Sequence, residues 1–234
     1  MLIIGHRGAA GLKPENTLES LRTGYESGAD MLEFDVRVTA DGVPVLMHDS
    51  SLLRTNGLRH TVRLSTFEEL QLVTRDSDKP IASLDQVMEA LFGKVMLNIE
   101  FKQHGNVGAL IGVLKKYCLT PDDWAKVVVS SFYTKELARI RKACPDIGLW
   151  LLHGRNPFIF VAYARRLGLS GVGFNRMFLN DFAMEIAHKT HMFTYVFTVN
   201  RISAIESLAD HGVDGIVTDF PDRFATMDKD SHRH

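Results

Sequence analysis

The stretch MLEFDVR at residues 31–37 alternates apolar and polar side chains with the period of a β-strand. Glu33 and Asp35 therefore share one face of this strand, while the apolar side chains share the other face. Because the apolar face must pack against helices, the two carboxylates must point to the inner side of a sheet that helices cover from outside. The stretch thus predicts a buried strand with an acidic inner face.

Apolar stretches typical of strands recur along the whole chain, with helical patterns between them. Besides 31–38, the candidate strands are 2–6, 95–101, 126–132, 147–153, 171–174, 193–199 and 213–219. Strands that alternate with helices predict a parallel sheet with covered faces. Eight such units in about 220 residues fit an α/β fold of the closed (β/α)8 TIM-barrel type. An open doubly wound sheet fits less well, because the sequence has no Gly-rich phosphate-binding fingerprint. Helix starts are expected at a capping box over residues 16–19, at Thr134 and at Ser203.

One further apolar run, residues 43–48, lies only four residues after the second strand. Four residues cannot form a parallel crossover, and Asp41-Gly42 is a hairpin signal, so this run should lie antiparallel to the second strand. The next residues, about 50–82, break the rhythm of strands and helices and predict a small insertion over one mouth of the barrel. We expect one domain over residues 1–226 and a polar tail over 227–234.

Composition and charge exclude several classes of protein. The chain has 234 residues, with 27 Lys and Arg against 28 Asp and Glu, so it lacks the basic field that binds nucleic acid or anionic membranes. It has no apolar run of the ~20 residues that a membrane span needs, and its N-terminal run is too short for a signal peptide. With only Cys118 and Cys144, no disulfide framework is expected, which favours a cytoplasmic protein. Nothing in the sequence sets an oligomeric state.

A second strand repeats the acidic pattern of the first. Asn98, Glu100 and Lys102 alternate with apolar residues and share one face. Together with Glu33 and Asp35, this places three acids in the barrel interior, where they repel each other unless a cation or protons compensate. A hard divalent ion is the simplest compensation, and the absence of Cys or paired His nearby favours Mg²⁺ or Ca²⁺ over Zn²⁺. The alternative is that Lys102 and Arg37 neutralise the acids structurally.

Two histidines end strands at the mouth where barrel enzymes hold their active sites. His6 ends the first strand and His48 ends the hairpin arm. Such a pair can supply one base and one acid near neutral pH, although a lone histidine is more often structural. His153 also ends a strand and is a weaker candidate. Arg7 and Lys102 are cations suited to a phosphate group, and their alternative role is to pair with the same carboxylates.

Nine short motifs along the chain together resemble one enzyme family. They are GHRG (5–8), PENT (14–17), GAD (28–30), EFDV (33–36), TADG (39–42), HD (48–49), NIEFK (98–102), TVN (198–200) and GVDGIVTD (212–219). In this order they resemble the motifs of the glycerophosphodiester phosphodiesterases. LRTNG (53–57) and SLD (83–85) resemble the start and end of the insertion of that family, which is short here. The resemblance runs from residue 5 to about residue 221.

The resemblance implies a phospholipase-C-like barrel with a divalent metal ion. Glu33, Asp35 and Glu100 would be the metal ligands, and His6 and His48 would be the catalytic acid and base.

The resemblance also implies residues that bind substrate. Arg7 and Lys102 would contact the phosphate, with Glu15 orienting Arg7. Phe197 stands where the family often has Trp, which keeps an aromatic wall for the substrate; a structural Phe in the strand is the alternative. Asn16 is expected to cap the helix that follows.

The expected function is metal-dependent hydrolysis of small glycerophosphodiesters to glycerol 3-phosphate and an alcohol, with acid and base catalysis by two histidines. One alternative is a lysophospholipase D or a cyclising phospholipid lyase on the same site, for which residues 158–160 or 177–179 would supply an apolar mouth. The other is a non-catalytic binder of a phosphate ligand. No nucleic-acid partner and no stable membrane insertion are expected.

Overall fold

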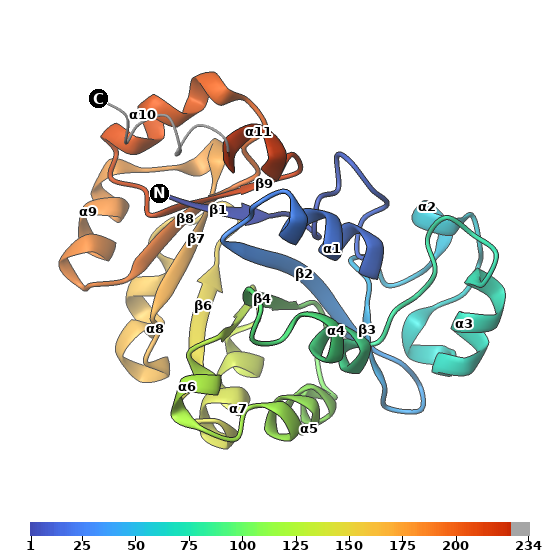
Figure 1. The fold of residues 1–234 in the computed structure, drawn as a ribbon. Helices are drawn as coiled ribbons and strands as arrows, with labels where there is room; N and C mark the ends of the chain where they lie inside the picture. Colours follow the sequence, from blue (N-terminus) through green and yellow to red (C-terminus); the bar gives the residue numbers. More distant parts are fainter. Residues whose placement is uncertain (226–234) are drawn as a thin grey trace.

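The computed structural model describes residues 1–225, and its centre is a closed barrel of parallel strands (Figure 1). The barrel strands are β1 (Leu2–Gly5), β2 (Met31–Val38), β4 (Met96–Phe101), β5 (Val127–Ser131), β6 (Gly148–Leu152), β7 (Gly171–Asn175), β8 (Phe193–Phe197) and β9 (Gly215–Thr218). β1 pairs with both β9 and β2, which closes the sheet. The predicted TIM barrel is therefore confirmed, with strand ends within two residues of those expected. The predicted tail 227–234 lies outside the described residues.

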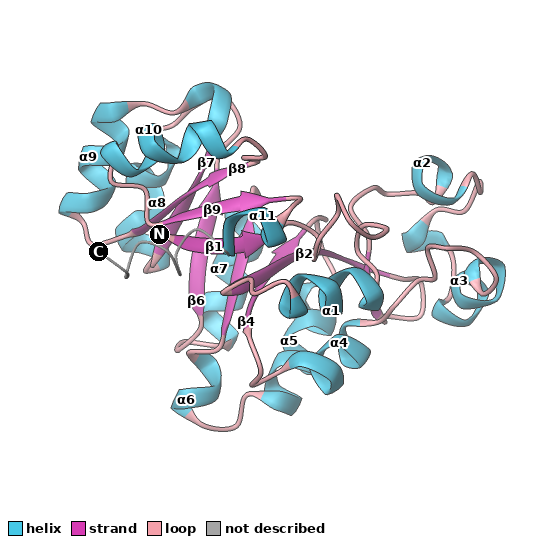
Figure 2. Ribbon diagram, turned by 45° about the horizontal axis from the view of Figure 1, so that its top comes forward, coloured by secondary structure: helices cyan, strands magenta, loops and turns pink. Residues whose placement is uncertain are grey.

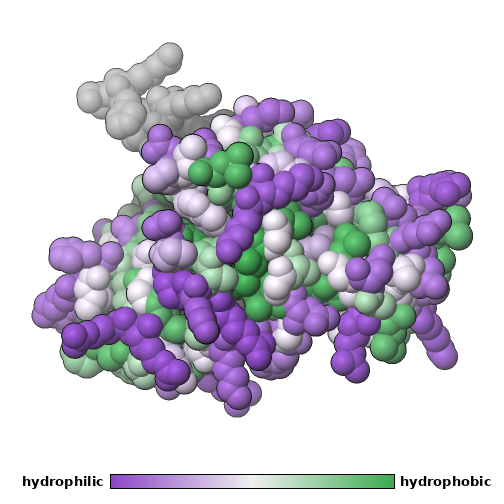
Figure 3. Space-filling model, turned by 90° about the horizontal axis from the view of Figure 1, so that it is seen from below, coloured by the Kyte–Doolittle hydropathy of each residue, from purple (hydrophilic) through white to green (hydrophobic). Residues whose placement is uncertain are grey.

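Helices surround the strands, as Figure 2 shows in cyan around magenta. They are α1 (Leu18–Glu26), α4 (Leu84–Leu91), α5 (Val107–Tyr117), α6 (Pro121–Trp124), α7 (Thr134–Ala143), α8 (Ile159–Leu167), α9 (Asp181–Lys189), α10 (Ile205–Asp210) and α11 (Pro221–Ala225). No helix in the part of the chain that the structure describes is long and apolar enough to cross a membrane. The face seen in Figure 3 is mostly hydrophilic, with apolar side chains showing in patches between polar ones.

Two apolar layers determine where a site can lie. The larger layer fills the space between the barrel and the helices, and both cysteines are buried in it without a disulfide. A smaller layer inside the barrel contains Ile4, Met31, Trp150 and Tyr195. Ile4 precedes His6 and Met31 precedes Glu33 along the chain, so this layer fills the end where the strands start. Only the opposite end, where the strands finish, is left for polar side chains.

The hairpin arm forms as predicted. β3 (Pro44–Leu46) lies antiparallel to β2 through the turn at Asp41-Gly42, where Gly42 has a φ of 83°. The residues that follow form a lobe with α2 (Leu53–Asn56) and α3 (Phe67–Thr74), to the right of the barrel in Figure 1. This lobe has its own apolar cluster, in which Leu52, Val62 and Leu70 are fully or almost fully buried. The lobe is thus held by local packing and by β3.

The start of α1 differs from the expectation for Asn16. Thr17 is the N-cap, because its side chain accepts a hydrogen bond from the Ser20 amide. Asn16 has a left-handed backbone with a φ of 57°, and its side chain turns into the barrel instead. The prediction that Asn16 caps the helix was therefore wrong. The predicted start at Ser203 was also early, because residues 202–204 form a separate 3-10 turn before α10.

Candidate active site

Three carboxylates meet at the end of the barrel where the strands finish. Glu33 and Asp35 come from β2 and Glu100 comes from β4, and Asp35 and Glu100 are register partners in the parallel pair. One oxygen of each carboxylate lies within 4.8 Å of the others. Glu33 and Asp35 are buried, and Glu100 is almost so. The period-2 pattern thus brings these acids together, as predicted from the sequence.

The cations around the acids compensate them only in part. Lys102 Nζ lies 2.7 Å from Glu100 Oε1 and 3.6 Å from Asp35 Oδ1. Arg7 Nε lies 3.3 Å from Asp35 Oδ2, and the Arg7 amide donates to Glu33. Arg37, in contrast, has no described carboxylate within 4 Å and donates from Nε to a backbone carbonyl. Of the two cations in the alternative structural interpretation, Lys102 therefore pairs with the acids, whereas Arg37 forms no ion pair with them among the described residues.

Burial and mutual repulsion leave this cluster ready to accept a cation. Burial, followed by the negative charge of Asp35, raises the pKa of Glu33 to about 7 and that of Glu100 to about 8. Carboxylate oxygens are the hard ligands that Mg²⁺ and Ca²⁺ prefer. The donor set therefore fits a divalent ion, with Lys102 and Arg7 beside it.

Asn16 holds the central acid of the cluster in place. Its side-chain amide donates to Asp35 Oδ2 over 2.9 Å, and its side-chain oxygen accepts from the Asp35 amide over 3.0 Å. This pair of bonds fixes the Asp35 carboxylate, whose other oxygen faces Lys102. Asn16 is thus a positioning residue, which the helix-cap interpretation missed.

His6 and Arg7 are presented by a tight turn after β1. A β-carbon on Gly5 would lie 2.2 Å from the Gly8 carbonyl oxygen. Gly8 has a φ of 89°, and a β-carbon there would lie 2.4 Å from the backbone of Ser20. The turn therefore requires glycine at both ends.

A chain of hydrogen bonds orients His6. Its Nδ1 lies 2.6 Å from Asp219 Oδ1, and the other Asp219 oxygen accepts from the side chain of Asn200. Because an ionised carboxylate only accepts, Nδ1 must carry the hydrogen and Nε2 is left for a reacting group. Burial acts to lower the pKa of His6, but the Asp219 hydrogen bond and the charge of Glu33 outweigh it and raise that pKa.

His48, just after β3, has a similar arrangement. Its Nδ1 lies 2.6 Å from Asp49 Oδ1, and the Arg54 guanidinium of α2 donates to the other Asp49 oxygen. Burial lowers the pKa of His48 from its ordinary value despite this partner. Both histidines thus have an aspartate on Nδ1, although their pKa values shift in opposite directions.

Glu15 connects the insertion to Arg7. It accepts hydrogen bonds from Arg54 and from Arg7, which is 2.7 Å away. Burial alone would raise the pKa of Glu15, but the two guanidinium groups hold it at about 2. This carboxylate therefore stays ionised, and it fixes the direction of the Arg7 side chain.

A small cavity of about 30 Å³ lies at the centre of the mouth, lined by His6, Glu33, Glu100, Ser130, Leu152, Tyr195, Phe197 and Val217. Phe197 is half-buried, and its ring meets Phe132 edge to face with centroids 6.3 Å apart. Below the acids, polar atoms of Asn98, Ser130 and Tyr195 have no hydrogen-bond partner in the described part of the protein. The floor of the site is therefore polar.

His153, the third histidine considered from the sequence, does not lie in the candidate active site. It is 1% exposed and packs edge to face on Phe174, in the layer between barrel and helices. Sequence reasoning in turn missed the partners of the two histidines. Asp219 ends the last barrel strand and Asp49 directly follows His48, so both positions gave a signal, whereas nothing local pointed to Arg54.

Comparisons with known proteins agree on one family. The model of the glycerophosphoryl diester phosphodiesterase family matches residues 6–223. A glycerophosphodiester phosphodiesterase of Bacillus altitudinis is 30% identical over 240 residues, covering 94% of this chain and 95% of its own. The crystal structure of a glycerophosphodiester phosphodiesterase from Thermotoga maritima is 26% identical, with a TM-score of 0.83 over 97% of this chain and 98% of its own.

A third match shares the fold. It is a phosphodiesterase of Oleispira antarctica in complex with its product sn-glycerol-3-phosphate, 24% identical, with a TM-score of 0.87 over 97% of this chain and 96% of its own.

Proposed function

The chain belongs to the glycerophosphoryl diester phosphodiesterase family, and on this basis we propose that it hydrolyses glycerophosphodiesters to glycerol 3-phosphate and an alcohol. Glycerophosphocholine and glycerophosphoethanolamine are examples of such substrates. The observation that carries the proposal is the cluster of three carboxylates with two histidines beside it. Each histidine is oriented by its own aspartate.

Glu33, Asp35 and Glu100 would hold a divalent ion, Mg²⁺ or Ca²⁺. When bound, such an ion supplies a Lewis acid that lowers the free energy of negative charge at phosphorus. Arg7 and Lys102 would contact the phosphate, and Glu15 would keep Arg7 directed towards it. Phe197 would give the glycerol an apolar wall at the central cavity.

His6 and His48 would move the protons of the reaction. One imidazole would take a proton from the attacking oxygen through Nε2, and the other would donate a proton to the leaving alcohol. Both Nδ1 atoms are occupied by aspartates, so each ring keeps a fixed orientation as it gains and loses its proton.

We expect the attacking oxygen to be the 2-hydroxyl of the substrate, which gives a cyclic phosphate that water then opens. A hydroxyl already held beside phosphorus avoids the entropic cost of ordering an outside water. The acid of the first step can act as the base of the second.

The test of this route is a diester of propane-1,3-diol, which lacks the 2-hydroxyl. We expect a large loss of kcat relative to the glycerol diester, and an early cyclic phosphate with the normal substrate. Equal turnover numbers for the two diesters would contradict the internal route.

Asp219→Asn should lower the pKa of His6, because the variant removes the negative charge that stabilises the imidazolium and leaves at most a neutral acceptor at Nδ1. His6 would then lose its proton at lower pH, and kcat should fall although the imidazole is still present. The measurement is an NMR titration of His6 in both proteins, with Asp181→Asn, on the exposed start of α9, as control. An unchanged pKa of His6 would show that Asp219 does not raise the pKa of that imidazole.

Exposed apolar residues support a second candidate, a lysophospholipase D. Phe158, Met177 and Phe178 lie on the loops after β6 and β7, at the active-site mouth, and are 38%, 79% and 37% exposed. Phe160, expected to join them, is fully buried and belongs to the core.

Turnover assays with glycerophosphocholine and a lysophospholipid, each with and without Mg²⁺ or Ca²⁺, separate the candidates. We expect turnover of glycerophosphocholine. Turnover of the lysophospholipid alone would favour the second candidate, a cyclic product that persists would indicate a lyase, and no turnover of any diester would indicate a binder. We also propose a cytoplasmic location, which the two buried, unbridged cysteines support.

A further inference from the structure

A larger cavity adjoins the acidic cluster, between the barrel and the insertion. Its volume is about 410 Å³, against about 30 Å³ for the central cavity. Lys102 lines this larger cavity and also contacts Glu100, so the larger cavity begins one side chain away from the proposed metal ligands. The cavity is large enough for a group the size of an alcohol headgroup.

Cationic side chains line this cavity without acidic ones. Arg37, Arg63 and Lys102 are among its lining residues, and no carboxylate is. Lys102 is already paired with Glu100 and Asp35, so the net charge comes from the two arginines. Arg37 donates only to the backbone carbonyl of His48, and its terminal amino groups have no acceptor in the described protein. Arg63 is exposed and has no described ion-pair partner.

The start of helix α5 adds to this positive potential. Asn106, the N-cap of α5, lines the cavity, and its side chain makes no capping hydrogen bond. The first turn of α5 contains no acidic residue. The carboxylate near this helix end is that of Glu136, which accepts from the Gly105 amide and is itself paired with Arg139, and it does not line the cavity. Tyr133 and His104 complete this wall, with ring centroids 4.0 Å apart.

We propose that this cavity binds the alcohol half of the diester and selects alcohols that carry a phosphate or a carboxylate group. The inference rests on the proposed hydrolysis of glycerophosphodiesters and specifies its substrate class. The proposed function directs the glycerol half to His6 and Phe197 at the central cavity, so we assign the larger cavity beyond Lys102 to the alcohol. Free guanidinium groups on Arg37 and Arg63 suit an anionic group.

A choline headgroup is a poor match to the same cavity. A trimethylammonium group is bound by carboxylates or by an open aromatic face. The cavity has no carboxylate, and one face of Tyr133 is covered by His104. A cationic alcohol would therefore meet the side chains of Arg37 and Arg63 with no carboxylate in the cavity lining.

The test compares four diesters of glycerol 3-phosphate whose alcohols are choline, glycerol, serine and glycerol phosphate. We expect kcat/KM to be about tenfold higher for the phosphate-bearing diester than for the choline diester at low salt, and the ratio to shrink as salt screens the charges. Serine carries an ammonium group beside its carboxylate, so its diester should give a kcat/KM between those of the choline and the phosphate-bearing diesters. No turnover of any diester would refute the proposed function itself, whereas equal kcat/KM values for all four would refute only this inference.

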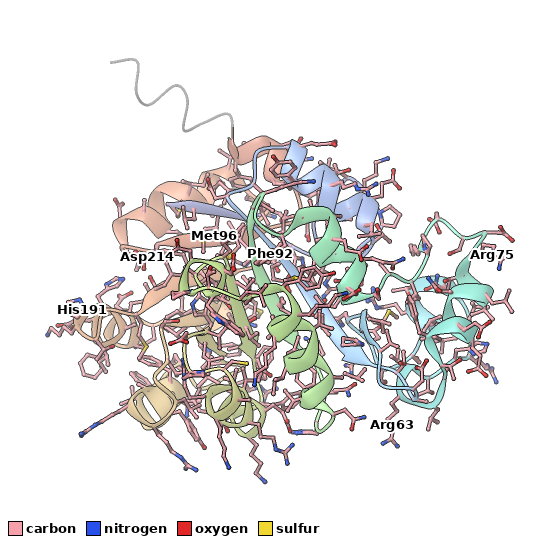
Figure 4. The ribbon with its side chains drawn as sticks, turned by 60° about the horizontal axis from the view of Figure 1, so that its bottom comes forward. Arg63, Arg75, Phe92, Met96, His191 and Asp214 are labelled. Atoms are coloured by element: carbon pink, nitrogen blue, oxygen red, sulfur yellow. The ribbon has the colours of Figure 1, made fainter. Side chains whose placement is uncertain are left out.

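Charge reversal in the insertion supplies the matched variants. Figure 4 shows Arg63 at the lower edge of the lobe and Arg75 at its outer edge, and only Arg63 lines the cavity. Both side chains are exposed. Arg63→Glu should lower the ratio of kcat/KM for the phosphate diester over the glycerol diester by about tenfold, and Arg75→Glu should not change it. The milder Arg63→Gln should give an intermediate ratio. An unchanged ratio in Arg63→Glu, with native circular dichroism, would overturn the inference.

Discussion

Replacing either His6 or His48 by alanine is expected to lower kcat roughly 10²-fold to 10⁴-fold, the range for loss of a general acid or base. Each imidazole lies within the electrostatic influence of one of the acids, can exchange a proton near neutral pH, and is held by an aspartate on Nδ1. The folded structure should persist, because both rings lie at the mouth and not in the core. The measurement is steady-state kinetics with circular dichroism as the check on folding.

His60→Ala is the matched control for these variants. His60 lies in the insertion, and its side chain has no hydrogen bond or ion pair within the described residues. Its replacement should leave kcat unchanged. The wild-type pH profile should be bell-shaped, with two constants that belong to the histidine pair and not to either ring. A rate within a few-fold of wild type for His6→Ala or His48→Ala would make that histidine structural.

Glu100→Gln is expected to weaken divalent-ion affinity by more than about 100-fold. Losing a residue that only hydrogen-bonds a metal ligand already costs roughly 10–100-fold in affinity, and Glu100 is proposed as a ligand itself. At limiting metal, activity should fall accordingly. The metal-free variant should nevertheless fold, because glutamine removes one of three mutually repelling charges. Binding can be followed without activity, from the increase in melting temperature on adding Mg²⁺ or Ca²⁺.

The raised pKa values of two of the acids determine how the stability of the metal-free protein changes with pH. Glu33 and Glu100 have folded pKa values of about 7 and 8, above the ordinary value of 4.5. Their contribution to stability is therefore present below pH 4.5 and is lost as the pH rises through 7 and 8. The metal-free wild type should melt at a lower temperature at pH 8.5 than at pH 5, by on the order of 5 °C.

In Glu100→Gln this decrease should be smaller, since glutamine does not titrate. Glu89→Gln, on the exposed side of α4, is the control and should behave like the wild type. A melting temperature that rises towards pH 8.5 in the metal-free wild type would contradict the clustering of the acids.

The strands and the acidic cluster could be predicted because strand periodicity is a local property. Residues 31–37 dictate which face Glu33 and Asp35 share, and the parallel register then sets Asp35 beside Glu100. The histidines could be placed at the mouth because both end strands. These predictions needed only the spacing of residues within each strand and the parallel arrangement of the strands.

The remaining features depend on residues far apart in the chain. Asp219 contacts His6 although the two residues are 213 positions apart in the sequence, and Arg54 contacts Glu15 although they are 39 positions apart. Asn16 adopts a left-handed backbone that its motif does not reveal, and this turns its amide towards Asp35. Such pairings follow from barrel closure and loop geometry, so no local pattern predicts them.

The most direct test of metal-dependent glycerophosphodiester hydrolysis is the turnover of glycerophosphocholine by protein stripped of divalent ions, before and after Mg²⁺ or Ca²⁺ is added back. The arrangement of Glu33, Asp35 and Glu100 predicts that stripping abolishes turnover and that one of the two ions restores it. Undiminished turnover by the stripped protein would contradict the role given to these three carboxylates.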